Sequence, residues 1–191
     1  SSENNIKNVR FLNADIFDDV LTDNYFDFIW TNGVLHHTKD PKKAFEISIK
    51  SLKKEGYILV GLYNSIGRIR TKVRKYIYKL FGKRITMFLD PVLRNIKSGS
   101  PDQIDAWIRD QYQHPVESTH TIDEVLKWFD ENNIEFVSSI PKCNIDLNIT
   151  NDLFLSQKRG NLFYRLINQI FMLFNYLGDD GGLFVVIGKK K

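Results

Sequence analysis

The sequence has very little cysteine, no glycine-x-glycine spacing and no long uninterrupted apolar run. Its single cysteine, Cys143, cannot form a disulfide within the chain, and such a chain suits the reducing cytoplasm. No catalytic or metal-binding pattern surrounds Cys143, so we expect an incidental buried thiol. These absences exclude a small disulfide-stapled secreted domain and predict a cytoplasmic protein.

The most apolar stretch, residues 161–177, is shorter than the roughly 20 residues that a membrane-spanning helix needs. Polar residues interrupt it, so we expect an amphipathic helix packed on the core or on a partner, and no transmembrane segment. The first residues, SSENN, have neither the basic nor the apolar region of a signal peptide. The chain does not begin with methionine, which leads us to expect a trimmed or partial chain.

The remaining composition is that of one globular domain over residues 1–191. Hydrophobic residues make up 42% of the chain and charged residues 26%, which is typical of a folded protein with a real core. The formal net charge of +4 permits binding to nucleic acid but does not require it.

Alternating or continuous apolar patterns predict five strands, over residues 8–16, 25–33, 57–63, 134–141 and 182–190. A helix is predicted over 40–56, because Asp40 can cap its start, Pro41 suits the first helical position and Gly56 can end it. Two apolar strands joined by this helix form a βαβ unit, and therefore a parallel sheet with a right-handed crossover.

Residues 64–120 are predicted to form a helical, basic insert. Residues 68–97 alone carry ten basic side chains and one acid, Asp90, for a local net charge of +9. Ile69, Val73 and Leu80 recur at helical spacing, and further helices are predicted after Ser100 and after the TIDE capping box at Thr121. The basic helix has two interpretations: a solvated face with its apolar side on the core, or a docking surface for an anionic substrate, nucleic acid or a membrane.

Polar residues follow three of the predicted strands at the point where each ends. They are Asn13 to Asp15, Thr31 to Gly33, and Tyr63 with Asn64. In an open α/β sheet, ligands bind outside the carboxyl ends of the parallel strands. The sequence therefore predicts a cofactor cleft at this edge.

The stretches NIKNVRFLNADI, YFDFIWTNGVLHHTKDPKKAF and SLKKEGYILVGLYN, in this order, resemble the middle of a class I S-adenosylmethionine-dependent methyltransferase. The resemblance implies an α/β fold: a partial Rossmann-like sheet, from the third to the seventh strand of the family, with a helical insert after the fifth. It also implies that Asp15 binds the adenine amino group, that Ile16 packs on the adenine ring, and that the methionine part of the cofactor lies beside Thr31, Asn32, Gly33 and Val34.

The family's glycine-rich loop and the acidic residue that holds the ribose hydroxyls are not found in this sequence. We therefore expect the C-terminal portion of a methyltransferase, inactive on its own and with weak or no binding of S-adenosylmethionine, or a chain that has lost the cofactor site. The upstream strands and their loop would belong to the complete enzyme.

The candidate catalytic residues are histidines and one glutamate. His114, Glu117 and His120 are spaced by three, but Pro115 and the helix start at Thr121 make this segment a loop, so we expect no metal site. Methyl transfer needs in-line placement and sometimes a base, and a loop with these residues can cover the acceptor or merely satisfy backbone groups. His36 and His37 lie in the turn after a strand, and His37 is the fourth candidate.

The sequence thus predicts methyl transfer from S-adenosylmethionine to an unidentified acceptor, which we expect to be a small molecule. Binding of nucleic acid through residues 68–97 stays open. A second interpretation is a non-catalytic methyltransferase-like module that binds a protein or nucleic-acid partner. The acceptor atom and the oligomeric state are not indicated by the sequence.

Overall fold

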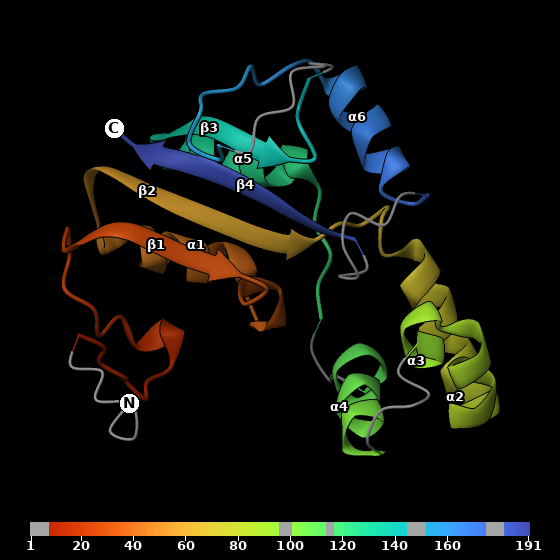
Figure 1. The fold of residues 1–191 in the computed structure, drawn as a ribbon. Helices are drawn as coiled ribbons and strands as arrows, with labels where there is room; N and C mark the ends of the chain where they lie inside the picture. Colours follow the sequence, from red (N-terminus) through yellow and green to blue (C-terminus); the bar gives the residue numbers. More distant parts are fainter. Residues whose placement is uncertain (1–7, 96–100, 114–116, 145–151, 175–181) are drawn as a thin grey trace.

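The computed structural model describes residues 8–95, 101–113, 117–144, 152–174 and 182–191. At its centre lies a four-stranded sheet with the strand order β1-β2-β4-β3 (Figure 1). Its strands are β1 (Phe26–Asn32), β2 (Leu52–Tyr63), β3 (Ile134–Ile140) and β4 (Leu183–Lys190). β1 runs parallel to β2, whereas β4 lies between β2 and β3 and is antiparallel to both. The partial Rossmann-like sheet expected from the sequence is confirmed in this arrangement.

The predicted βαβ unit is present, but its helix is shorter than expected. Helix α1 (Pro41–Lys50) begins with Pro41 in its first turn, and the Asp40 carboxylate accepts a hydrogen bond from the Lys43 amide at 3.1 Å. The chain then enters β2 at Leu52, so the prediction that the helix continues to Gly56 is wrong. Leu52 is fully buried and pairs with Phe26, and the residues between Leu52 and Tyr57 form an irregularity in the strand. Burial of Leu52 thus outweighs the helix propensity of the lysines that follow.

The strand predicted over residues 8–16 is not formed. This segment is irregular and leads into a short 3-10 helix, η1 (Ile16–Asp18). A strand depends on the hydrogen bonds to its neighbour, and no strand among the described residues pairs with this segment. The described sheet therefore corresponds to the family's fourth to seventh strands.

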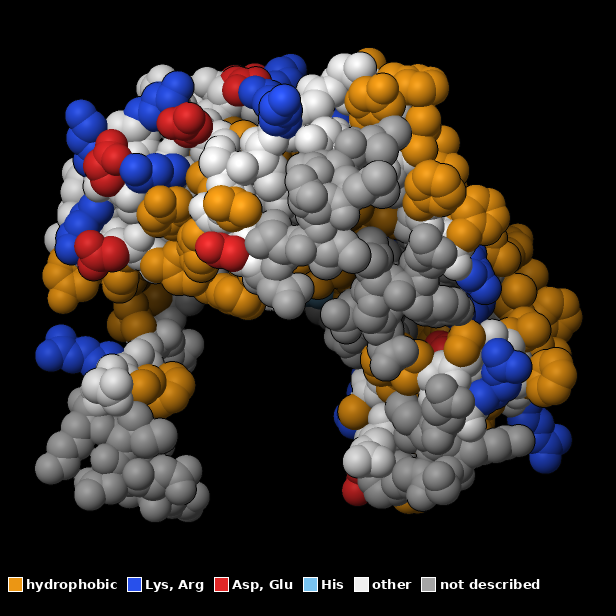
Figure 2. All heavy atoms as spheres, turned by 45° about the horizontal axis from the view of Figure 1, so that its top comes forward, with side chains coloured by type: hydrophobic (Ala, Val, Ile, Leu, Met, Phe, Trp, Pro, Cys, Tyr) orange, Lys and Arg blue, Asp and Glu red, His pale blue; other side chains and the backbone are white. Residues whose placement is uncertain are grey.

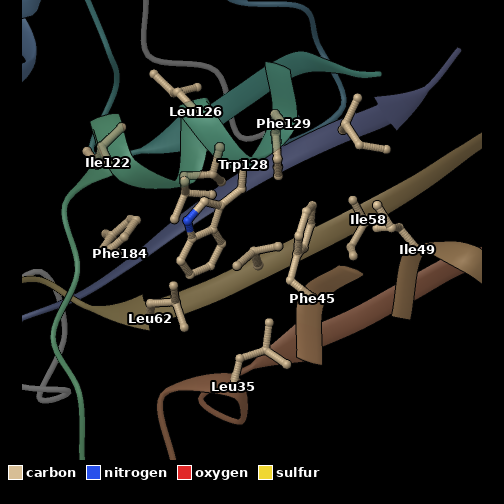
Figure 3. Packing of buried hydrophobic residues seen from close by; sticks show 14 of the residues in the cluster. Leu35, Phe45, Ile49, Ile58, Leu62, Ile122, Leu126, Trp128, Phe129 and Phe184 are labelled. Atoms are coloured by element: carbon tan, nitrogen blue, oxygen red, sulfur yellow. The ribbon is translucent and has the colours of Figure 1, made fainter. Parts of the chain in front are cut away.

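The main core lies between one face of the sheet and two helices, α1 and α5 (Ile122–Glu131) (Figure 3). Phe45 of α1 stacks on Phe129 of α5 with ring centroids 5.7 Å apart, and Trp128 lies 5.8 Å from Phe45. The predicted capping box at the start of α5 is confirmed, since Thr121 accepts from the Glu124 amide. These contacts fix both helices on the sheet.

A second, smaller cluster covers the other face of the sheet. Leu59, Val137 and Ile187 are buried there, with Tyr57 and Leu153 packed against them. Towards β1 this face becomes more open, and Phe28 and Trp30 are exposed.

Helices α2 (Ile69–Leu89), α3 (Pro91–Asn95) and α4 (Pro101–Tyr112) form a separate group beyond the ends of β1 and β2 (Figure 1). Asp90 organises this group: its carboxylate accepts from the Val92 amide, from Trp107 at 3.1 Å and from the Tyr112 hydroxyl. Gly82 interrupts α2 with a φ of 74°, a conformation that favours glycine. The expected N-cap Ser100 lies outside the described residues.

Helix α6 (Leu162–Phe171) confirms the predicted helix after residue 161, although it ends earlier than position 177, and residues 175–177 are outside the described part. Asn161 caps its start, and Arg165 pairs with Asp123 of α5 at 2.6 Å. In the part of the chain that the structure describes, no helix combines the length and the apolar character needed to cross a bilayer.

Candidate functional site at the carboxyl ends of β1 and β2

The end of β2 meets the turn after β1 in a stack of aromatic rings. The short 3-10 helix η2 (Leu35–His37) carries both neighbouring histidines. The ring of His36 lies 4.0 Å from that of Tyr63 and 4.2 Å from that of His37, measured between centroids. His36 is fully buried, whereas His37 is only half-buried. His36 therefore belongs to the scaffold, and His37 lies at its outer edge.

A buried arginine covers the other side of this stack. The guanidinium carbon of Arg68 lies 3.7 Å from the centroid of the Tyr63 ring, within cation-π distance. Arg68 donates to Glu117 from Nε and Nη2, at 3.2 and 2.8 Å, and from Nη1 to Gln111 at 2.9 Å. Its side chain is only 1% exposed. A charge buried this deeply is tolerated because it is paired and hydrogen-bonded.

Glu117 is the anionic member of this cluster. Burial raises the pKa of its carboxyl, but Arg68, and to a lesser degree Lys75 at 3.5 Å, outweigh burial and hold the pKa below its usual value. Glu117 is therefore a carboxylate at neutral pH. A carboxylate held by two cations is a poor base, so this geometry favours a positioning role.

Residues 117–120 tie the two strand ends together. The Ser118 amide donates to the His36 carbonyl at 2.9 Å, and the His120 amide donates to the Tyr63 carbonyl at 2.8 Å. The Ser118 hydroxyl lies 2.8 Å from Nε2 of His120, whose Nδ1 lies 3.0 Å from Glu124. The expected loop thus lies directly against the carboxyl ends of β1 and β2, and His120 is fixed on both ring nitrogens.

Asn64, the residue after β2, has a structural role. Its side-chain nitrogen Nδ2 donates to the Gln169 side chain of α6 at 2.8 Å. Its side-chain oxygen Oδ1 accepts from the backbone amides of Ile66 and Gly67. Gln169 also accepts from the Ile122 amide at 2.9 Å. Asn64 therefore joins β2 to α5 and α6 and shapes the turn that leads to Arg68.

The residues predicted beside the methionine part of the cofactor lie together at the end of β1. Thr31 is buried, and its hydroxyl donates to the Leu59 carbonyl at 2.8 Å. The side-chain oxygen of Asn32 is buried without a hydrogen-bond partner among the described residues. Gly33 adopts a φ of 74° with open space where a side chain would begin, and Val34 is exposed. The end of β1 thus leaves room for a ligand at Gly33 and Val34, whereas the Asn32 oxygen faces Gly61 of β2.

The residues predicted at the adenine do not lie with the end of β1 but against the last turns of α1, just before β2 begins. Asp15 caps η1, and its Oδ1 accepts from the Phe17 amide at 2.9 Å. Asp15 and Ile16 line a pocket of about 220 Å³ that also touches Ser48 and Ser51. An ionised carboxylate has several acceptor positions, so the capping bond leaves capacity for a ligand's amino group.

The structure brings His37, Glu117 and His120 to the same strand edge, while His114 lies outside the described residues. Sequence reasoning missed Arg68, Gln111 and Ser118, which the structure places in this cluster. Arg68 stands in a run of basic residues, and nothing in its spacing distinguishes the one that is buried. Among the described residues, no three histidine, cysteine or acidic side chains converge as a metal site requires.

Comparisons with known proteins agree with this arrangement. A family model described as a methyltransferase domain matches residues 1–133. A curated relative, an uncharacterised protein of Synechococcus sp., is 25% identical over 148 residues, which is 68% of this chain and 36% of the relative. The chain thus spans little more than a third of that relative's length.

Two solved structures share the fold at low sequence identity. PKMT2 from Rickettsia typhi, in complex with AdoHcy, matches with a TM-score of 0.68 and 14% identity over all of this chain and 41% of its own. A chain from the complex between the Haloferax volcanii Trm112 methyltransferase activator and a methyltransferase matches with a TM-score of 0.51 and 12% identity, over 98% of this chain and 64% of that one. The chain belongs to the methyltransferase-domain family, among the class I S-adenosylmethionine-dependent methyltransferases.

Proposed function

We propose that this chain supplies the adenine-side and methionine-side residues, and the acceptor edge, of a site for methyl transfer from S-adenosylmethionine. The observation that carries the proposal is the pocket of about 220 Å³ lined by Asp15 and Ile16, in a chain that belongs to the methyltransferase-domain family. The capping bond to the Phe17 amide leaves the Asp15 carboxylate with further acceptor positions for a ligand that donates a hydrogen bond. The adenine amino group is such a donor.

The residues present fit the cofactor in part. Asp15 would accept from the adenine amino group, Ile16 would pack on the ring, and the segment from Thr31 to Val34 would border the methionine part. When bound, S-adenosylmethionine would supply a methyl group for transfer to an oxygen, nitrogen or carbon nucleophile, with S-adenosylhomocysteine as the leaving group. The chain's own residues would orient the cofactor and the acceptor relative to each other.

On the acceptor side, His37 is the proposed base. Its half-buried ring lies 6.1 Å from that of Tyr63 at the open side of the stack, where it can take a proton from an oxygen or nitrogen acceptor. Glu117 and His120 would act as positioning residues, since Glu117 holds Arg68 and His120 holds Ser118. The expected acceptor is a small molecule.

The helical segment 64–120 is proposed to set acceptor specificity. It contributes Arg68, Gln111 and Glu117 to the cluster at the strand edge. Additions at the carboxyl edge of a parallel sheet overhang the ligand cleft, so their side chains meet the acceptor.

The 191 residues are expected to bind S-adenosylmethionine only weakly on their own, because the sequence has no glycine-x-glycine loop to hold the rest of the cofactor. Isothermal titration calorimetry of this chain with S-adenosylmethionine tests this expectation. We expect a dissociation constant of about 1 mM or weaker. Micromolar binding would contradict the proposal that these residues form only part of the site.

A second candidate function is a non-catalytic module that binds a protein or nucleic acid. It is favoured by the +9 charge of residues 68–97 and by the absence of a glycine-rich loop. One fold relative also comes from a complex with an activator protein. Tight, salt-dependent binding of RNA together with no response to any S-adenosyl ligand would favour this module over the enzyme.

A further inference from the structure

Helix α2 turns its apolar side chains outward, whereas a helix on the surface of a soluble domain normally buries them. Its buried positions include Thr71 and Thr86, whereas Val73 is 54% and Leu80 59% exposed. Ile69, Val73, Tyr76 and Leu80 recur at spacings of three and four and are all exposed. The interpretation in which this apolar side packs on the core is therefore wrong. The inner face of α2 instead meets the polar cluster of Glu117 and its partners.

Helix α6 shows the same reversal. Its buried residue is Gln169, which is 2% exposed and hydrogen-bonded to Asn64. Its outer face carries the exposed side chains Phe163, Leu166, Ile170 and Phe171. An amphipathic helix normally turns its apolar stripe towards the core, so both reversed helices leave an apolar stripe without cover among the described residues.

The two stripes join into one surface. A groove of about 630 Å³ runs between Val73 and Ile77 of α2 and Leu173 and Phe174 just after α6. Figure 2 shows hydrophobic side chains as a band over α6 and α2, with Lys and Arg beside it. We name this band, the exposed apolar residues of 69–89 and 162–174, the α2–α6 surface. Contiguous exposed apolar patches of this kind mark interaction sites.

The charges that the two helices themselves carry are of one sign. Helix α2 contains seven Lys and Arg residues and no acid, and α6 contains one Arg and no acid. Within the described residues, Lys79 and Arg84 have no acidic partner, unlike Lys83, which pairs with Asp105 at 2.6 Å. The occupant of the surface must therefore be apolar and carry negative charge.

These properties favour a lipid surface over the other occupants. A second copy in a two-fold contact would bring the basic α2 against itself, with like charges facing each other. Nucleic acid satisfies the positive charge but leaves Val73, Leu80 and Leu166 against phosphates. Helices with aromatic and aliphatic side chains on one face and Lys and Arg beside them lie in the interface of anionic membranes, where long basic side chains reach the headgroups.

We propose that the α2–α6 surface docks the protein peripherally on an anionic lipid membrane. The apolar side chains of both helices enter the boundary between headgroups and acyl chains, and the basic side chains of α2 contact the lipid phosphates. Because α2 begins next to Arg68, which stacks on Tyr63, docking brings the strand edge close to the membrane.

Co-sedimentation of the chain with vesicles tests the proposal. We expect binding to vesicles of equal parts phosphatidylcholine and phosphatidylglycerol, weakening with salt, and little binding to phosphatidylcholine alone. The pairs Val73→Ser with Leu80→Ser, and Phe163→Ser with Phe171→Ser, should each lower binding about tenfold or more. The pair Lys79→Glu with Arg84→Glu should lower it by a similar factor.

Matched controls change exposed residues elsewhere. Val9→Ser with Phe11→Ser removes apolar area at a distant segment, where Phe11 is 83% exposed, and Lys43→Glu with Lys54→Glu reverses charge on α1 and β2. These variants should bind like the unchanged chain, and circular dichroism should show every variant folded.

Three results would overturn the proposal. They are no binding to the mixed vesicles, full binding by the serine pairs, and a dimer in sedimentation equilibrium that the serine pairs abolish while vesicle binding is absent. The last result would assign the surface to a second copy of the chain.

Discussion

The guanidinium of Arg68 lies over the ring of Tyr63, with its central carbon 3.7 Å from the ring centroid. This contact fixes the first turn of α2 on the last residue of β2. Through its hydrogen bonds to Glu117 and Gln111, Arg68 also connects the strand edge to α4 and to the loop before α5. Replacement of Arg68, Glu117 or Gln111 is therefore expected to change the structure at the strand edge.

Glu117→Gln should destabilise the chain strongly. The change leaves the buried Arg68 guanidinium without its counter-charge, which costs roughly 3 kcal/mol of the free energy of unfolding. Asp130→Asn is the matched control, because Asp130 pairs with Arg159 at 2.6 Å with both side chains well exposed. It should cost less than about 1 kcal/mol. Urea denaturation of both variants measures the difference, and equal losses would show that burial of the Arg68 pair is unimportant.

Stability should fall in acid, in part through the same carboxylate. The folded pKa of Glu117 lies below its ordinary value of 4.5, so its contribution is complete above that value and is lost as the pH falls through the folded pKa. The free energy of unfolding should therefore drop between about pH 6 and about pH 3, and less steeply in Glu117→Gln. Urea midpoints across this range give both curves, and parallel curves would contradict the assignment.

Gly61→Ala should destabilise the sheet through one specific neighbour. A Cβ at position 61 would lie 2.0 Å from the Asn32 side-chain oxygen. We expect a cost of about 2 kcal/mol in the unchanged background and a smaller cost beside Asn32→Ala, which removes the clashing atoms. Asn32→Ala alone should be nearly neutral, because its oxygen has no partner to lose.

Gly33→Ala is the control for the variants Gly61→Ala and Asn32→Ala. No atom lies within 4 Å of the added Cβ, and the φ of 74° alone should cost about 1 kcal/mol, with little dependence on the residue at position 32. Denaturation of the single and double variants forms a cycle. Strict additivity of Gly61→Ala with Asn32→Ala would show that the two residues do not collide.

The sequence was most informative where local chemistry decides the structure. Asp40 with Pro41, and Thr121 with Glu124, mark helix starts through hydrogen bonds within one turn, and both starts were predicted correctly. The end of α1 was missed because burial of Leu52 in β2, a long-range effect, overrides the local helix signal of the following lysines.

The remaining errors share this origin in tertiary contacts. Residues 8–16 alternate like a strand, but strand formation depends on a neighbouring strand that local sequence does not reveal. The spacing of Val73 and Leu80 identifies an apolar stripe without telling which way it faces. Arg68 can be buried because its charge is paired with Glu117, which follows 49 residues later in the chain. The sequence therefore predicts the position of the site at the strand edge. The buried cation at its centre, Arg68, is apparent only in the structure.

The most direct test of the central claim is a titration of the isotopically labelled chain with S-adenosylhomocysteine, followed by the amide resonances of its backbone. The account predicts weak binding, with half-saturation at about 1 mM or above, and shifts concentrated at Ile16, Gly33 and Val34. Asp15→Ala should reduce these shifts while the chain stays folded. Shifts confined to other regions, or none at these three residues at saturating ligand, would contradict the proposed cofactor site.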